Sequence, residues 1–141
     1  QTDKGKYPCL KDYWDIEVNL YDPCFKKYNI LTKNKVDITI CIDVLEHIPN
    51  QDIDWILKDF ISITNKIVFI NVACYKAGAT LPNGKNAHVN IQTYEWWEKK
   101  LIECALIFKD IKILAFCTFI SEKNKRMIRC IEINDSYGKY T

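Results

Sequence analysis

Two apolar, β-branched runs separated by an amphipathic helix pattern constrain the fold of this chain most strongly. The runs, Val36–Ile42 and Lys66–Ala73, are nearly continuous in apolar character, as expected of strands that are covered on both faces. Between them, apolar residues from Ile53 to Ile61 recur at helical spacing after the expected N-cap Asn50. This order predicts an α/β fold.

Further strands and a second helix extend the pattern in both directions. Glu17–Tyr21 is predicted to be a short strand, and a second helix is expected after its N-cap Thr93. Strands at Ile111–Phe119 and Arg126–Asn134, joined by a polar turn, predict a closing antiparallel hairpin. We therefore predict a single α/β domain over residues 1–141, a Rossmann-like open twisted sheet. The sheet is expected to be mostly parallel, with the hairpin antiparallel and helices on both faces.

The charge balance and the apolar runs limit the partners of the chain. Twenty Lys+Arg and eighteen Asp+Glu residues give a net charge of +2, and only Arg126 and Arg129 are arginines. A nearly neutral chain with so few arginines argues against nucleic acid. The longest apolar runs, Ile67–Cys74 and Ile111–Ile120, are well short of the roughly 20 residues of a membrane helix. We expect a small-molecule substrate and no membrane.

The seven cysteines show no metal-ligand spacing, because the chain contains no C-x-x-C pair. Four of them sit inside apolar runs, where a free thiol behaves as a small hydrophobic side chain. These four are Cys41, Cys74, Cys117 and Cys130. We expect a reduced, cytoplasmic protein without a structural metal.

Polar residues follow both buried strands, at the edge where open α/β sheets bind ligands. Asp43, Glu46 and His47 follow the first strand, and a polar stretch that contains His88 follows the second. Asp43 is placed to face a cationic or hydroxyl-bearing ligand, and either histidine can relay a proton near neutral pH. The alternative is a polar loop whose acids cap local backbone groups. With no companion cysteine or clustered acid, the two histidines predict no metal site.

Two further features have more than one interpretation. Asp22 ends the first predicted strand, where an acid can accept hydrogen bonds from a ribose diol, but Asp22-Pro23 is also a common turn. The stretch from Tyr75 to Gln92 is longer than an ordinary connection, which indicates a functional or a disordered loop.

The run V-D-I-T-I-C-I-D-V-L-E-H-I-P, followed by a helix and then K-I-V-F-I-N-V-A, resembles class I S-adenosylmethionine-dependent methyltransferases. In that family a V-L-E-H pattern marks the fourth strand and the start of the next helix. The segment N-G-K-N-A-H-V, followed by E-W-W, is similar to the loop and helix after strand five in a subgroup of small, type-11-like methyltransferases. The resemblance covers roughly residues 17 to 134.

This resemblance implies S-adenosylmethionine as the cofactor and methyl transfer to a small molecule. It assigns Asp22 to the ribose hydroxyls and Gly5 to the cofactor loop. Asp43 and Glu46, with His47, are assigned to the border between cofactor and substrate. His47 and His88 are then the candidate catalytic bases.

The glycine-rich motif that follows the family's first strand is absent, and only Gly5, in Lys4-Gly5-Lys6-Tyr7, resembles the tail of such a loop. The chain also begins at Gln1 without a methionine, so we expect an N-terminal truncation that removes the first strand. That strand lies between strands two and four in the family. Its absence predicts unpaired strand edges and hence marginal stability, a rearranged sheet or a homo-oligomer.

Two other functions stay open. A methyltransferase-like domain without catalysis acts as a binding or assembly module, and the missing glycine loop favours this alternative. A Rossmann-like transferase with a nucleotide donor is the other, but the sequence shows no basic clamp for a diphosphate.

Overall fold

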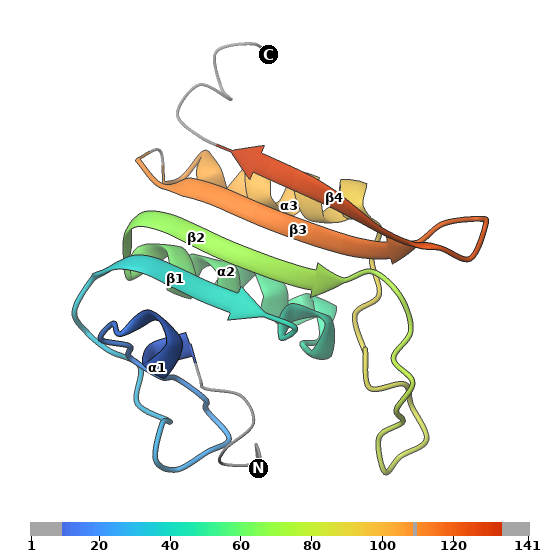
Figure 1. Ribbon diagram of the computed structural model, residues 1–141, viewed down its shortest axis with the longest axis horizontal. Helices are drawn as coiled ribbons and strands as arrows, with labels where there is room; N and C mark the ends of the chain where they lie inside the picture. Colours follow the sequence, from blue (N-terminus) through green and yellow to red (C-terminus); the bar gives the residue numbers. More distant parts are fainter. Residues whose placement is uncertain (1–9, 109, 134–141) are drawn as a thin grey trace. The chain divides into compact units, whose positions relative to one another are not determined.

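The predicted strand–helix–strand unit forms the centre of the structure. In the computed structural model, which describes residues 10–108 and 110–133, β1 (Val36–Ile42) and β2 (Thr64–Ala73) pair in parallel (Figure 1). The helix α2 (Ile53–Ser62) connects them. β1 has the predicted bounds, and β2 begins two residues before its predicted start at Lys66.

A second crossover and a hairpin complete the sheet. The helix α3 (Tyr94–Ala105) leads into β3 (Lys112–Ile120), which lies parallel to β2, and β4 (Arg126–Ile133) returns antiparallel to β3. The strand order is β1-β2-β3-β4. The predicted α/β class, the mostly parallel open sheet and the closing hairpin are therefore confirmed.

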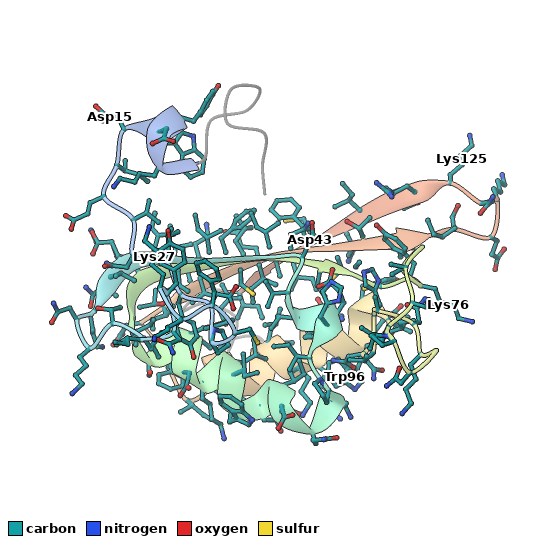
Figure 2. All side chains as sticks on the ribbon, turned by 90° about the horizontal axis from the view of Figure 1, so that it is seen from below. Asp15, Lys27, Asp43, Lys76, Trp96 and Lys125 are labelled. Carbon is teal, nitrogen blue, oxygen red and sulfur yellow. The ribbon has the colours of Figure 1, made fainter. Side chains whose placement is uncertain are left out.

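Both long helices cover the same face of the sheet, as Figures 1 and 2 show from two directions. Helices on both faces were expected, and among the described residues of the unit 34–141 this expectation is wrong. The physical reason is the strand order, because both parallel crossovers step in the same direction across the sheet. Right-handed crossovers that share a direction place their helices on one face.

The core lies between this covered face and the two helices, and the predicted apolar stripes of both helices face it. Its buried side chains include Val68, Ile70 and Val72 of β2, Ile113, Ala115 and Cys117 of β3, Ile53, Leu57 and Ile61 of α2, and Trp97, Leu101 and Cys104 of α3.

The opposite face of the sheet is apolar and largely uncovered. Ile38, Ile40 and Ile42 of β1 point to it and are 52%, 41% and 43% exposed. The register places them beside Ile67, Phe69 and Asn71 of β2. β1 is thus an alternating strand with one exposed apolar face, and the expectation that both of its faces are covered is wrong.

The helix starts differ in how they are capped. Thr93 caps α3 as predicted, since its Oγ1 accepts a hydrogen bond from Trp96 N at 3.3 Å. The predicted N-cap Asn50 is wrong, because the 3₁₀ turn Asn50–Asp52 precedes α2 and Asp52 takes the cap position. In this tighter turn the backbone carbonyl of Asn50 accepts from the amide of Ile53, so no side-chain cap forms.

Residues 1–33 form a separate compact unit, and the described part of it contains the short helix α1 (Leu10–Trp14). The strand predicted over Glu17–Tyr21 is wrong, because residues 16–20 have no regular structure. A strand exists only by pairing, and the four described strands pair with one another alone. The amide of Asp22 instead donates to the carbonyl of Tyr28 within its own loop, at 2.9 Å. Gly5 and the predicted strand end Asn134 lie outside the described residues.

Replacing isoleucine by alanine is expected to lower the free energy of unfolding by different amounts on the two faces of the sheet. Ile70→Ala, at a position that is 1% exposed, is expected to lower the free energy of unfolding by about 2–5 kcal/mol. Ile40→Ala, on the uncovered face, is expected to cost about 1 kcal/mol or less, the span of strand preference. Urea unfolding followed by circular dichroism measures both. Equal costs would contradict an uncovered face.

Candidate functional site at the carboxyl edge of the sheet

β1 and β2 are parallel, so their carboxyl ends meet at one edge of the sheet and bring distant polar residues together. Asp43 follows β1 directly, with a left-handed backbone at φ 53°, which aspartate tolerates better than most residues. Its amide donates to the carbonyl of Asn71 at 3.1 Å, and its Oδ1 accepts from Asn71 Nδ2 at 3.0 Å. The exposed Asp43 carboxylate is thus held against the end of β2.

Glu46 lies in the 3₁₀ turn Leu45–His47 and is buried, with 1% of its surface exposed. Its Oε1 accepts a hydrogen bond from the amide of Ala73 at 3.2 Å. No hydrogen-bond partner for the second oxygen, Oε2, exists among the described residues, although that atom is fully buried. A buried carboxylate oxygen without a partner costs free energy, so this position calls for a cation or a proton.

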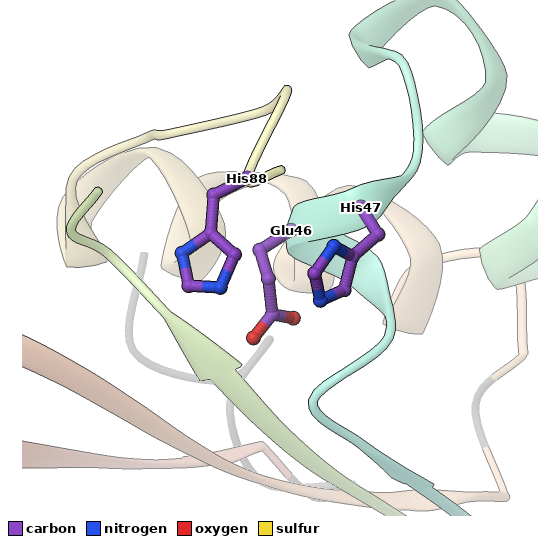
Figure 3. A group of neighbouring side chains, drawn as sticks. All are labelled: Glu46, His47 and His88. Carbon is purple, nitrogen blue, oxygen red and sulfur yellow. The ribbon is translucent and has the colours of Figure 1, made fainter. Parts of the chain in front are cut away.

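Two imidazole rings flank this carboxylate, as Figure 3 shows. The ring centroids of His47 and His88 lie 4.9 Å apart in an edge-to-face arrangement. His47 Nδ1 is 2.9 Å from the carbonyl oxygen of Ala87, and His88 Nδ1 is 2.6 Å from that of Tyr75. A carbonyl oxygen only accepts, so Nδ1 carries the proton in both rings. In each neutral ring the lone pair is therefore on Nε2.

The long polar stretch between β2 and α3 is an ordered loop that returns His88 to the edge. The side chain of Asn86 holds it together: Oδ1 accepts from the amides of Ala77 and His88, each at 3.0 Å, and Nδ2 donates to the carbonyl of Ala77 at 2.9 Å. The amide of Asn90 then donates to the backbone carbonyl of Glu46 at 3.0 Å. Asn86 and Asn90 carry no sequence signal for these roles, because the roles depend on the path of the loop.

The edge carries negative charge. The pKa of the Cys41 thiol is raised to about 12, chiefly by burial and further by the carboxylates of Glu46 and Asp43.

A hollow of about 420 Å³ is lined in part by Cys74, the residue after Ala73. Its other lining residues are Ile91, Gln92, Thr93, Tyr94, Glu95, Phe119 and Ile120. The hollow is shallow and open to solvent.

Of the predicted site residues, the structure brings Glu46, His47 and His88 together and places Asp43 on the same edge. The inference that the two histidines lack a companion acid is wrong, since the 3₁₀ turn directs Glu46 between them. Asp22 belongs to the other unit, where its Oδ1 accepts from the amide of Cys24 at 2.9 Å, the turn-forming alternative.

Comparison with known proteins gave no family assignment: no known protein family matches the chain, and neither the curated proteins nor the solved structures gave a match. None of the described helices has both the length and the apolar character needed to span a bilayer. The cysteines that the structure describes are all free thiols.

The thiols of Cys74 and Cys117 differ in their pKa. A hydrogen bond from Cys117 to the Cys74 sulfur lowers the pKa of Cys74, and the same bond raises the pKa of Cys117. A lowered pKa leaves more thiolate at a given pH, and the thiolate is the reactive form. Half-buried Cys74 is therefore expected to react with iodoacetamide at pH 8 severalfold faster than buried Cys41 or Cys117.

Site-resolved mass spectrometry measures these rates. Cys117→Ala removes the donor and is expected to slow alkylation of Cys74, whereas Cys117→Ser keeps a donor and is the matched control. An unchanged rate in the alanine variant would contradict this assignment.

Proposed function

We propose that this chain is an S-adenosylmethionine-dependent methyltransferase domain that transfers a methyl group to a small molecule in the cytoplasm. The observation that carries the proposal is the position of the D-V-L-E-H residues. Asp43, Glu46 and His47 follow β1 at the carboxyl edge of a parallel sheet, where α/β enzymes bind their ligands. The free thiols support a reducing compartment.

The sheet order supports a Rossmann-like fold. Three parallel strands in sequential order with helices on one face are the arrangement of one half of a doubly wound sheet. The other half of such a sheet covers the opposite face, which is the apolar face that β1 exposes here. β1 is an edge strand of the described sheet, which supports a further strand beside it in the functional fold.

The charge of the edge fits this cofactor. S-adenosylmethionine supplies an activated methyl group on a positively charged sulfonium, and carboxylates attract such a cation. Asp43 and Glu46 provide them, and both raise the pKa of neighbouring Cys41. Asp22 keeps the role toward the ribose hydroxyls that the resemblance implies. Gly5 keeps the role in the cofactor loop that the resemblance implies.

The histidines supply the acid–base chemistry in this proposal. The Nε2 lone pair of His47 or His88 accepts the proton of an acceptor hydroxyl or amine. The backbone carbonyls at Nδ1 hold each ring in the tautomer that this task needs. The loop that carries His88 also contributes Ile91 and Gln92 to the hollow at Cys74, and orientation of an acceptor there is the further contribution of the chain.

Calorimetry tests the cofactor assignment. The chain is expected to bind S-adenosylmethionine and S-adenosylhomocysteine, and Asp43→Asn is expected to weaken binding of the charged S-adenosylmethionine about tenfold, with a smaller effect on the uncharged product. Asp110→Asn, an exposed aspartate before β3 at the opposite edge of the sheet, is the matched control. Binding of neither compound would contradict the proposal.

A second candidate function is a binding or assembly module without catalysis, including a homo-oligomer. The exposed isoleucines of β1 favour it, because an uncovered apolar face is typical of interaction surfaces. Self-association without any binding of S-adenosylmethionine or S-adenosylhomocysteine would favour this second function.

A further inference from the structure

We propose that Glu46, His47 and His88 form a binding site for a divalent transition-metal cation, with zinc as the ion that best fits two imidazole nitrogens and one carboxylate. The proposal goes beyond methyl transfer, and none of its arguments depends on S-adenosylmethionine.

The three side chains already converge. Each offers one ligand atom, and these atoms all lie within 4.8 Å of one another. Ligand atoms around a tetrahedral zinc ion are about 3.3 Å apart, given bonds of about 2.0–2.1 Å. Small side-chain rotations therefore close the site around the ion. Two histidines and one glutamate are a recurrent ligand set of catalytic zinc, and they leave a coordination position open for water or a substrate.

His47 and His88 each make the hydrogen bond at Nδ1 that is typical of a metal-ligating histidine. A ligating histidine normally donates its other ring N–H to a carbonyl or a carboxylate, which fixes the tautomer and the ring orientation. His47 and His88 both meet this condition, through the carbonyls of Ala87 and Tyr75. Both rings thus have their lone pair on Nε2 and border the Glu46 carboxylate (Figure 3).

The buried oxygen of Glu46 is an independent observation that points to a cation. Oε2 is fully buried and has no hydrogen-bond partner among the described residues. Within the same part of the chain, no lysine or arginine forms an ion pair with Glu46. A divalent cation at this point compensates the charge and supplies the missing contact.

Metal binding and general-base action exclude each other at the same nitrogen. With zinc bound, His47 and His88 hold the ion and do not take a proton from the acceptor. A bound zinc ion would lower the pKa of a hydroxyl at the open coordination position, so that this hydroxyl could lose its proton to bulk water without a histidine base. The same three residues thus have distinguishable roles with and without zinc.

The experiment uses the 141-residue chain, freed of metal with a chelator and titrated with zinc chloride in a calorimeter. One zinc ion per chain is expected to bind. Glu46→Gln, His47→Gln and His88→Gln are each expected to weaken zinc binding at least tenfold. Glu132→Gln, whose glutamate pairs with Lys112 on the exposed side of the hairpin, is the control and is expected to bind zinc unchanged.

X-ray absorption at the zinc edge separates this site from binding by the cysteines. Only nitrogen and oxygen ligands at about 2.0–2.2 Å are expected, whereas thiolate ligands give a distance of about 2.3 Å. No zinc binding, a sulfur-containing shell, or equal affinity in the three variants (an adventitious ion only) would each overturn the proposal. If Glu46→Gln fails to fold by circular dichroism, His88→Gln and the absorption spectrum of the unsubstituted chain still decide.

Failure of this test leaves the methyltransferase proposal standing, because that proposal is tested by cofactor binding in metal-free buffer. Zinc binding without cofactor binding would support the metal site alone.

Discussion

The buried carboxylate of Glu46 joins three parts of the chain that are far apart in sequence. Glu46 lies in the turn after β1, and its side-chain Oε1 accepts a hydrogen bond from the amide of Ala73 at the end of β2. The backbone carbonyl of Glu46 accepts a hydrogen bond from the amide of Asn90, which precedes α3. Leu45, with no exposed surface, fixes the same turn in the core. The carboxyl edge is therefore organised around one charge that the described residues satisfy only in part.

The direction of the strands explains why the site forms where it does. Parallel pairing of β1 with β2 sends both chain exits to one edge, so that His47 and His88 meet although they are 41 positions apart in the numbering. The same topology sends both helices to one face and leaves the isoleucines of β1 exposed. The parallel strand order thus accounts for both the polar cluster and the uncovered apolar face.

Sequence patterns predicted those parts of the fold that local chemistry determines. The bounds of β1, the Thr93 cap and the closing hairpin follow from β-branched runs, a threonine hydroxyl and a polar turn. The strand predicted over Glu17–Tyr21 failed because a strand depends on a partner that local sequence does not specify. Asn50 failed as a cap because the backbone of a 3₁₀ turn satisfies the amide that the side chain was expected to bind.

Sequence patterns indicated which residues belong to the candidate site, but they did not indicate how these residues come together. Glu46, His47 and His88 stood out as polar residues after buried strands, yet their convergence depends on the 3₁₀ turn at Leu45 and on the path of the loop that Asn86 holds. Neither has a sequence signature. The absence of a companion acid was inferred from spacing along the chain, whereas ligand sets are assembled in space.

Anomalous diffraction at the zinc absorption edge, from crystals of the chain grown with zinc chloride, tests most directly whether Glu46 marks a cation site. The account predicts a single strong peak at about 2.0–2.2 Å from the carboxylate of Glu46 and from the Nε2 atoms of His47 and His88. A map with no peak between these three side chains, or with zinc only at cysteine sulfurs, would contradict it.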